Sequence, residues 1–172
     1  MARNEKDFLG LEVVSLEDAS VVGEVDGLIV DETTNSVVGL VLDLGIYEAR
    51  ALAFSDVLSV GEDAVMISSP QSVKPISQHA ALLEIAERQI EVSDALAITD
   101  KGNVIGVIGD FFVDPATGNL KGVEVISDED ADEPDGPKAH LVPMDEVVRI
   151  GAELVMLRDG FEGRAVSSGD EL

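Results

Sequence analysis

Short apolar runs separated by polar turns make up most of the chain. Between residues 8 and 68 six such runs follow one another, with Gly, Asp, Asn and Ser between them. Their spacing of about 8–12 residues is typical of the short strands of an all-β barrel or sandwich. The six expected strands lie in FLGLEVVSL, VVGEVDGLIVD, SVVGLVLDL, ALAF, VLSVG and AVMIS.

The same pattern then returns. The stretch VVGEVDGLIVDETTNSVVGLVLDL, from residue 21, matches VIGVIGDFFVDPATGNLKGVEVIS, from residue 104, at a spacing of 83 and without a gap. A fixed internal period indicates a repeated structural unit, so we expect two small barrels in tandem. The recurring positions are Gly23 with Gly106, Asp31 with Asp114, and Gly39 with Gly122.

The repeated residues are interpreted first as folding signals. Asp31 and Asp114 head the turns DETTNS and DPATGN, where an aspartate side chain caps the turn. Asn35 and Gly118 occupy the matching position where the backbone is expected to be left-handed. Glycines inside strands mark bulges or sharp bends, which a small barrel needs in order to close. The strand glycines are Gly23, Gly39, Gly106 and Gly122. The alternative interpretation of these turns and glycines is a ligand-binding site.

A second matching block ends each copy. AFSDVLSVGEDAVMI matches PMDEVVRIGAELVML at a spacing of 90, and the extra residues lie in the acidic stretch SDEDADEPDGPKAH. Between the copies, Leu82, Leu83, Ala86 and Ile90 are spaced for one face of a helix of about three turns, with Ser77 as its N-cap. We therefore expect a barrel over 8–68, a helical connector over 69–90, a second barrel over 91–158, and a disordered polar tail over 159–172.

Composition narrows the classes of partner. The 172 residues include 35 acidic and 11 basic side chains, a formal net charge of −24, and no cysteine. Such a charge repels nucleic acid and anionic lipid. Aromatic residues, at 3%, are too few for base-stacking platforms. With neither a signal-peptide pattern nor an apolar run of bilayer length, we expect a cytoplasmic protein without membrane insertion.

The strands, the aspartate-headed turn and the closing block, of the form DVxxVGxDxVxI, together resemble the PRC-barrel family. That family includes the cytoplasmic domain of the photosynthetic reaction-centre H subunit and the C-terminal domain of the RimM-type ribosome-maturation factor. The resemblance covers Phe8 to Ser68 and about Glu91 to Arg158. It implies two small, strongly bent β-barrels and contact with proteins rather than catalysis. The chain lacks the membrane helix of the first relative and the N-terminal domain of the second, so neither specific role transfers.

No catalytic or cofactor motif stands out in the sequence. Nucleophilic catalysis needs a nucleophile beside a base, and His79 and His140 are expected at the surface or as caps. The stretch from Asp128 begins like a calcium loop, but Glu133 replaces the required glycine and Ala139 the required glutamate. We expect no enzyme activity, no cofactor and no dedicated metal site.

The copies differ in a way that suggests an interface. Val38 and Val41 stand where copy two has Lys121 and Glu124, and Val107 stands where copy one has Glu24. The leading hypothesis is a non-catalytic interaction module that binds an unidentified protein or forms a homodimer, with the three valines at the contact between the barrels or between protomers. The alternatives are a ribosome- or RNA-linked accessory factor and a weak divalent-cation-binding regulator acting through residues 127–136.

Overall fold

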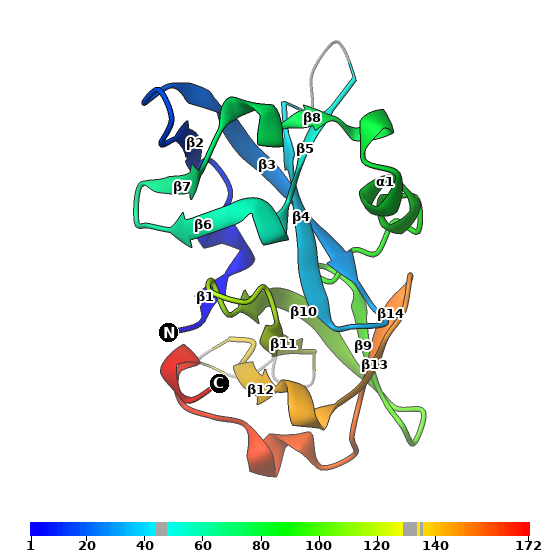
Figure 1. The fold of residues 1–172 in the computed structure, drawn as a ribbon. Helices are drawn as coiled ribbons and strands as arrows, with labels where there is room; N and C mark the ends of the chain where they lie inside the picture. The colour runs from blue at the N-terminus through cyan, green and yellow to red at the C-terminus, as the bar shows by residue number, and fades with distance from the viewer. Residues whose placement is uncertain (44–47, 129–133, 135) are drawn as a thin grey trace.

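The computed structural model describes residues 1–43, 48–128, 134 and 136–172, and it consists of two small β-barrels joined by a short helix. In Figure 1 the blue-to-cyan barrel lies above the green-to-orange one. Within the described residues each barrel is built on a sheet of seven strands. The expected all-β architecture of two tandem barrels is confirmed.

Six short strands form each repeat. The first barrel comprises β2 (Glu12–Ser15), β3 (Val21–Asp31), β4 (Ser36–Leu42), β5 (Arg50–Ala53), β6 (Val57–Val60) and β7 (Ala64–Ile67), with β8 (Lys74–Pro75) added beside β5. The second comprises β9 (Leu96–Thr99), β10 (Val104–Val113), β11 (Leu120–Ser127), β12 (Ala139–Pro143), β13 (Val147–Ile150) and β14 (Leu154–Leu157), with β1 (Arg3–Asn4) beside β10. Helix α1 (Ala80–Ala86) lies between the two repeats in the chain.

Both barrels have the same strand order. The first reads β6-β7-β2-β3-β4-β5 and the second β13-β14-β9-β10-β11-β12. In each, the first and last strands of the repeat (β2 with β7, β9 with β14) pair in parallel, and the other pairs within the repeat are antiparallel. Any position in one barrel therefore has a defined counterpart in the other.

The register irregularities recur at matching places. The pairing of β3 with β2 shifts between Val21 and Gly23, and that of β10 with β9 shifts between Val104 and Gly106. A further pair of shifts lies beside Gly39 and Gly122. Bulges bend and twist a strand, which allows so few strands to close around a core.

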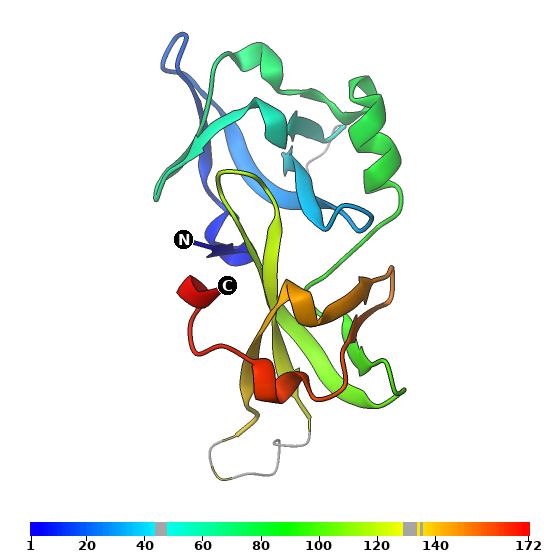
Figure 2. The ribbon, with the colours of Figure 1, turned by 60° about the horizontal axis from the view of Figure 1, so that its bottom comes forward.

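The two aspartate-headed turns meet at the seam between the barrels. The amide of Val37 donates to the carbonyl of Gly118 at 2.8 Å, and the amide of Leu120 donates to the carbonyl of Asn35 at 2.9 Å. Val37 corresponds to Leu120 and Asn35 to Gly118 in the 83-residue repeat, so each bond is the counterpart of the other and the seam is locally two-fold symmetric. Figure 2 shows the β10–β11 hairpin reaching up into the first barrel.

Gly118 is expected to be the sensitive position of this seam. Its φ is +81°, and a Cβ atom there would lie 2.6 Å from the Val37 carbonyl oxygen. Gly118→Ala therefore combines left-handed strain with a backbone clash, and we expect a loss of roughly 2 kcal/mol in unfolding free energy. Asn35→Gly, at the matching φ of +49°, should change it by less than about 0.5 kcal/mol. Urea unfolding measures both, and equal effects would contradict this account of the seam.

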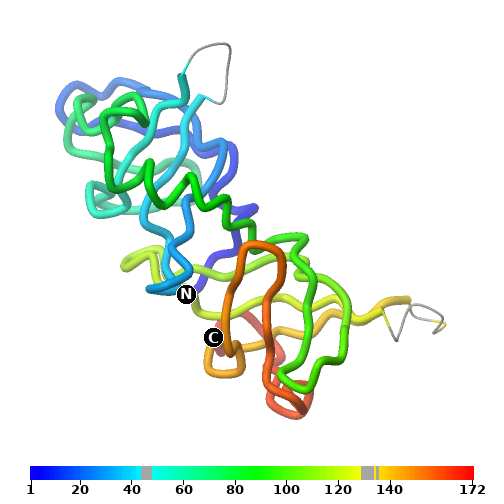
Figure 3. The backbone as a smooth tube through the Cα atoms, turned by 90° about the vertical axis from the view of Figure 1, so that its right-hand side faces the viewer, coloured from blue at the N-terminus to red at the C-terminus, as the bar shows by residue number. Residues whose placement is uncertain are grey.

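Each barrel is covered on one side by the segment that follows it. Leu82 of α1 lies over Gly39, and Leu172 lies over Gly122. Leu82 and Leu172 are 90 positions apart, the same spacing as the closing blocks. Figures 1 and 3 show α1 along the flank of the first barrel.

Two expectations about these covering segments need correction. The tail expected to be disordered packs instead: Phe161 is fully buried, and 3-10 helices span Phe161–Arg164 and Gly169–Glu171. The connecting helix spans only Ala80–Ala86, and Ser77 is not its N-cap. Ser77 lies in the preceding 3-10 turn Ile76–Gln78, where its amide donates to the Glu48 carboxylate at 3.1 Å.

The N-terminal segment crosses to the second barrel. Arg3 and Asn4 pair with Val113 and Phe112 of β10. The buried carboxylate of Asp110 accepts the Glu5 amide at 3.1 Å. Buried side chains of both barrels also belong to one contiguous core cluster. The barrels are therefore fastened together by a strand, the seam and shared apolar packing.

Candidate protein-binding surface

The repeated aspartates are used inside their turns. An oxygen of the Asp31 carboxylate accepts the amide of Thr33 at 2.9 Å and its hydroxyl at 2.6 Å. Asp114 accepts the amide of Ala116 at 2.8 Å. The Thr33 hydroxyl lowers the pKa of Asp31, and the Ala116 amide lowers the pKa of Asp114. Each of these carboxylates therefore has its hydrogen bonds within the chain.

These lowered pKa values give a pH-dependent stability. A depressed folded-state pKa means that the stabilisation is complete above the ordinary value of 3.8 and is lost as pH falls through the folded value. The double variant Asp31→Asn/Asp114→Asn should melt below wild type at neutral pH, and the gap should close as pH falls below 3.8. The control is Asp63→Asn/Glu153→Gln, two exposed carboxylates at matching positions. A gap independent of pH would contradict the capping role.

The three valines expected at an interface do not form one surface. Val38 and Val41 pack against the cluster of Ile29, Ala51 and Leu82. Helix α1 covers this face, which explains why the strand is apolar on both sides, and Val38 also lines a hollow with Ala116 and Thr117 of the second barrel. Val107 belongs to barrel two, where it stands opposite Leu96 and Ile126.

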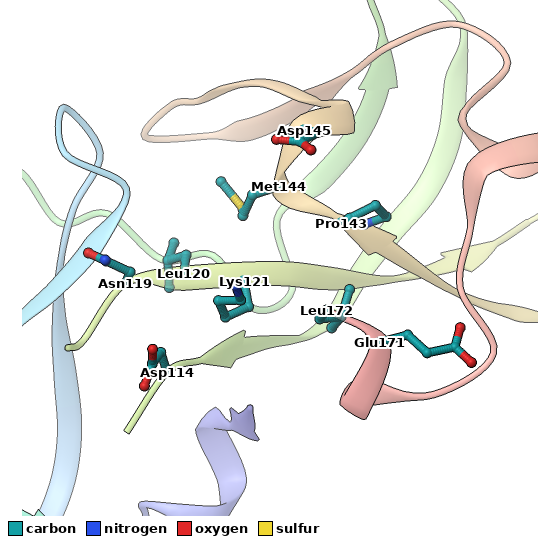
Figure 4. A pocket seen from close by; sticks show the side chains of 9 residues that line it. All are labelled: Asp114, Asn119, Leu120, Lys121, Pro143, Met144, Asp145, Glu171 and Leu172. Carbon is teal, nitrogen blue, oxygen red and sulfur yellow. The ribbon is translucent and has the colours of Figure 1, made fainter. Parts of the chain in front are cut away.

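A hollow of barrel two beside the C-terminus of the chain is lined by three carboxylates and one lysine, together with uncharged residues (Figure 4). In Figure 4, Asp114 and Asp145 lie on opposite sides of it, with Lys121 between them and Glu171 at one end. Its lining includes neither a histidine nor a hydroxyl side chain. The nine lining residues are Asp114, Asn119, Leu120, Lys121, Pro143, Met144, Asp145, Glu171 and Leu172.

The outer face of barrel two carries an apolar strip, defined here as Leu96, Val107, Ile126 and Leu154. Val107 is the register partner of both Leu96 and Ile126, and Leu96 is that of Leu154. The four side chains therefore form one row across the adjacent strands β11, β10, β9 and β14. Leu96 is 40% exposed and Val107 36%, while Ile126 and Leu154 are half-buried.

Barrel one has charges in the same row. Glu12 is paired with Glu24 and with Ala64, as Leu96 is paired with Val107 and with Leu154. Asp43 stands 83 positions before Ile126, but it follows the end of β4 and binds Arg50. One fold thus carries two paired carboxylates on one copy and an apolar row on the other. The barrel closes with either set, so folding alone does not require the apolar one.

Sequence comparison located one member of this strip and missed three. The substitution of Glu24 by Val107 is visible because the second strands align without a gap. Leu154 matches Ala64 in the closing blocks, whereas Leu96 lies in the first strand of its repeat, outside both matched stretches. Their pairing joins residues nearly 60 positions apart, and this became visible only with the register.

The family model for the PRC-barrel domain matches residues 4–74 and 92–162. The chain belongs to the PRC-barrel family. The two matches cover most of the 172 residues and coincide with the two barrels. Among curated proteins, none matches the chain.

Membership of the PRC-barrel family fits a small non-catalytic module, since the family is in general non-catalytic. In the part of the chain that the structure describes, no three His, Asp or Glu side chains are grouped so that they could hold a metal ion. Within the same residues, no helix has the length and apolar character needed to cross a membrane. The apolar strip is the surface at which paired positions of the two barrels differ in charge.

Proposed function

We propose that the chain is a non-catalytic protein-interaction module in which the apolar strip of barrel two contacts a protein partner. The observation that supports this is the contrast between the repeats: Leu96 and Val107 replace Glu12 and Glu24 at the same paired positions. Barrel one, bound through the seam, holds and orients barrel two.

The strip has the physical properties of a contact surface. Removing apolar area from water contributes roughly 25 cal/mol per Å², so an exposed apolar row gains free energy when a partner covers it. The backbone beneath it is already paired within the sheet, so contact is made through side chains. A rigid sheet also loses little conformational entropy on binding.

Self-association is the nearest alternative within the same proposal. A second copy would place its own strip against the first, giving a symmetric dimer. No observation favours the RNA-linked role, because a surface of net charge −24 repels phosphate. For the cation-binding role, most of the acidic stretch at 127–136 lies outside the described residues.

Site-specific photo-crosslinking in cells that produce the protein tests the proposal. A photoreactive amino acid is placed at Val107 in one variant and at Glu24, its counterpart in barrel one, in the other. We expect a discrete adduct at position 107 and none at position 24. Mass spectrometry of the adduct identifies the partner protein, or a second copy of the chain.

The adduct must also depend on the strip. Adding Leu96→Glu to the position-107 variant should abolish it, since this places in barrel two the residue that barrel one tolerates. Equal labelling at positions 107 and 24, or an adduct that survives Leu96→Glu, would count against the apolar strip as the binding surface.

A further inference from the structure

We infer that the partner of the apolar strip is a different protein, whose contact surface has an apolar centre bordered by Lys and Arg side chains. This inference rests on the proposed function and adds the chemistry of the partner. The centre follows from the strip itself: its four side chains have no charge and no hydrogen-bonding group. Buried polar groups facing it would be left without partners, so complementary side chains are apolar.

Carboxylates border the strip along β11. Glu124 stands two positions before Ile126 on β11 and faces the same side of the sheet, and Asp128 directly follows the end of the strand. The side chains of Glu124 and Ile126 both lie over Gly109, which places this carboxylate on the outer face beside the strip.

Carboxylates also stand at both ends of β9. Asp94 precedes the strand and Asp100 follows it, and both side chains are exposed. Basic side chains stand there too: Lys101 follows Asp100, Lys138 precedes the register partner of Ile126, and Lys6 forms an ion pair with Asp110, the register partner of Glu124. The four border carboxylates Glu124, Asp128, Asp94 and Asp100 outnumber these three lysines, so Lys and Arg on the partner would be complementary to the acidic majority.

The same charges disfavour a second copy as the occupant. In a two-fold dimer each border of carboxylates would face an identical one, and each chain would bring a net charge of −24. Like charges brought together at an interface cost free energy, and strip burial would have to overcome this cost. A basic-bordered partner gains from both the burial and the charge.

Two synthetic amphipathic helices serve as probes. Both have leucines along one face; the basic probe has lysines beside them and the acidic probe has glutamates. Fluorescence anisotropy against the full chain, at fixed ionic strength, measures each affinity. We expect the basic probe to bind at least about 10-fold more tightly than the acidic one, the effect of roughly one favourable charge pair at an interface.

Two variants separate strip binding from general attraction to an acidic protein. Leu96→Glu/Val107→Glu makes the chain more negative, yet we expect it to bind the basic probe at least about 30-fold more weakly, because two central apolar contacts are lost. Glu12→Leu/Glu24→Val builds a strip on barrel one, and we expect a second equivalent of basic probe to bind. A folding defect cannot produce that gain.

The outcomes separate this inference from the proposed function. If both probes bind equally and both need Leu96 and Val107, the basic border is wrong and the strip remains a binding surface. If the basic probe binds wild type and the Leu96→Glu/Val107→Glu variant alike, the attraction is general and the inference fails. The inference also fails if neither probe binds. It fails as well if light scattering shows a wild-type dimer that Leu96→Glu/Val107→Glu dissociates. In these two cases the crosslinking experiment at Val107 still tests the proposed function independently.

Discussion

Gly106→Ala should lower the free energy of unfolding by about 3 kcal/mol or more, a large share of the stability of a typical small domain. A Cβ atom at Gly106 would overlap the carbonyl oxygen of Ile126 on the neighbouring strand. Both atoms belong to paired backbone, so relief requires β10 and β11 to separate at the centre of barrel two. Urea unfolding followed by circular dichroism measures the loss.

The matching glycine of barrel one is the control. A Cβ atom at Gly23 would lie 2.9 Å from the ends of the Arg50 and Leu42 side chains, which can move aside. Gly23→Ala should therefore cost no more than about 1.5 kcal/mol. If the two variants are equally stable, the close approach of β10 and β11 at Gly106 is not a feature of the folded protein.

Phe161→Ala should cost about 3–5 kcal/mol, as expected for removal of a fully buried phenylalanine. Phe161 has no exposed surface, and its ring meets that of His140 edge-on with centroids 6.1 Å apart. The adjoining tail is held by an ion pair of 2.7 Å between Arg164 and the buried carboxylate of Glu146. The alanine leaves a cavity that this short segment cannot fill.

Glu162→Ala, at the exposed neighbouring position, provides the comparison and should change stability by less than about 0.5 kcal/mol. Limited proteolysis adds a second measurement, because Phe161→Ala should expose the bonds after Arg158 and Arg164 to trypsin. A Phe161→Ala variant as stable and as resistant as Glu162→Ala would mean that residues 159–172 form the disordered tail expected from the sequence.

The alternation of apolar and polar residues and the internal repeat predict most of the fold from the sequence. All six strands of copy one coincide with stretches selected from apolar runs, because each strand keeps one face in a core and is bounded by turn-forming residues. The spacing of 83 identifies the two turns as equivalent positions, but it does not show that they contact each other. A turn's own hydrogen bonds are local, whereas the bond from Val37 to Gly118 joins two copies.

The sequence did not predict the contacts of segments that lack a periodic pattern of apolar residues. The tail has one aromatic anchor, Phe161, and one end contact, Leu172, and neither forms a pattern by itself. The cover over Val38 and Val41 comes from a seven-residue helix, so a strand apolar on both faces indicated a contact but not its source. The 90-residue spacing of Leu82 and Leu172 was available in the sequence as a signal for both.

The apolar strip was predicted least well, because it depends on a difference between copies across four strands. Val107 alone is a single surface valine, which is common and uninformative. It becomes part of a row only when β9 and β14 are paired in parallel beside β10, a connection between residues far apart in the chain. Comparing the two copies at every paired position would have found it.

The central claim is that the apolar strip, and not the barrel pair in general, binds the protein partner. The most direct test is the dissociation constant of the protein crosslinked at Val107, measured by calorimetry against wild type and Leu96→Glu/Val107→Glu, with melting curves to show that both are folded. The account predicts that the variant melts close to wild type and binds at least about 30-fold more weakly. A folded variant with the wild-type dissociation constant would contradict it.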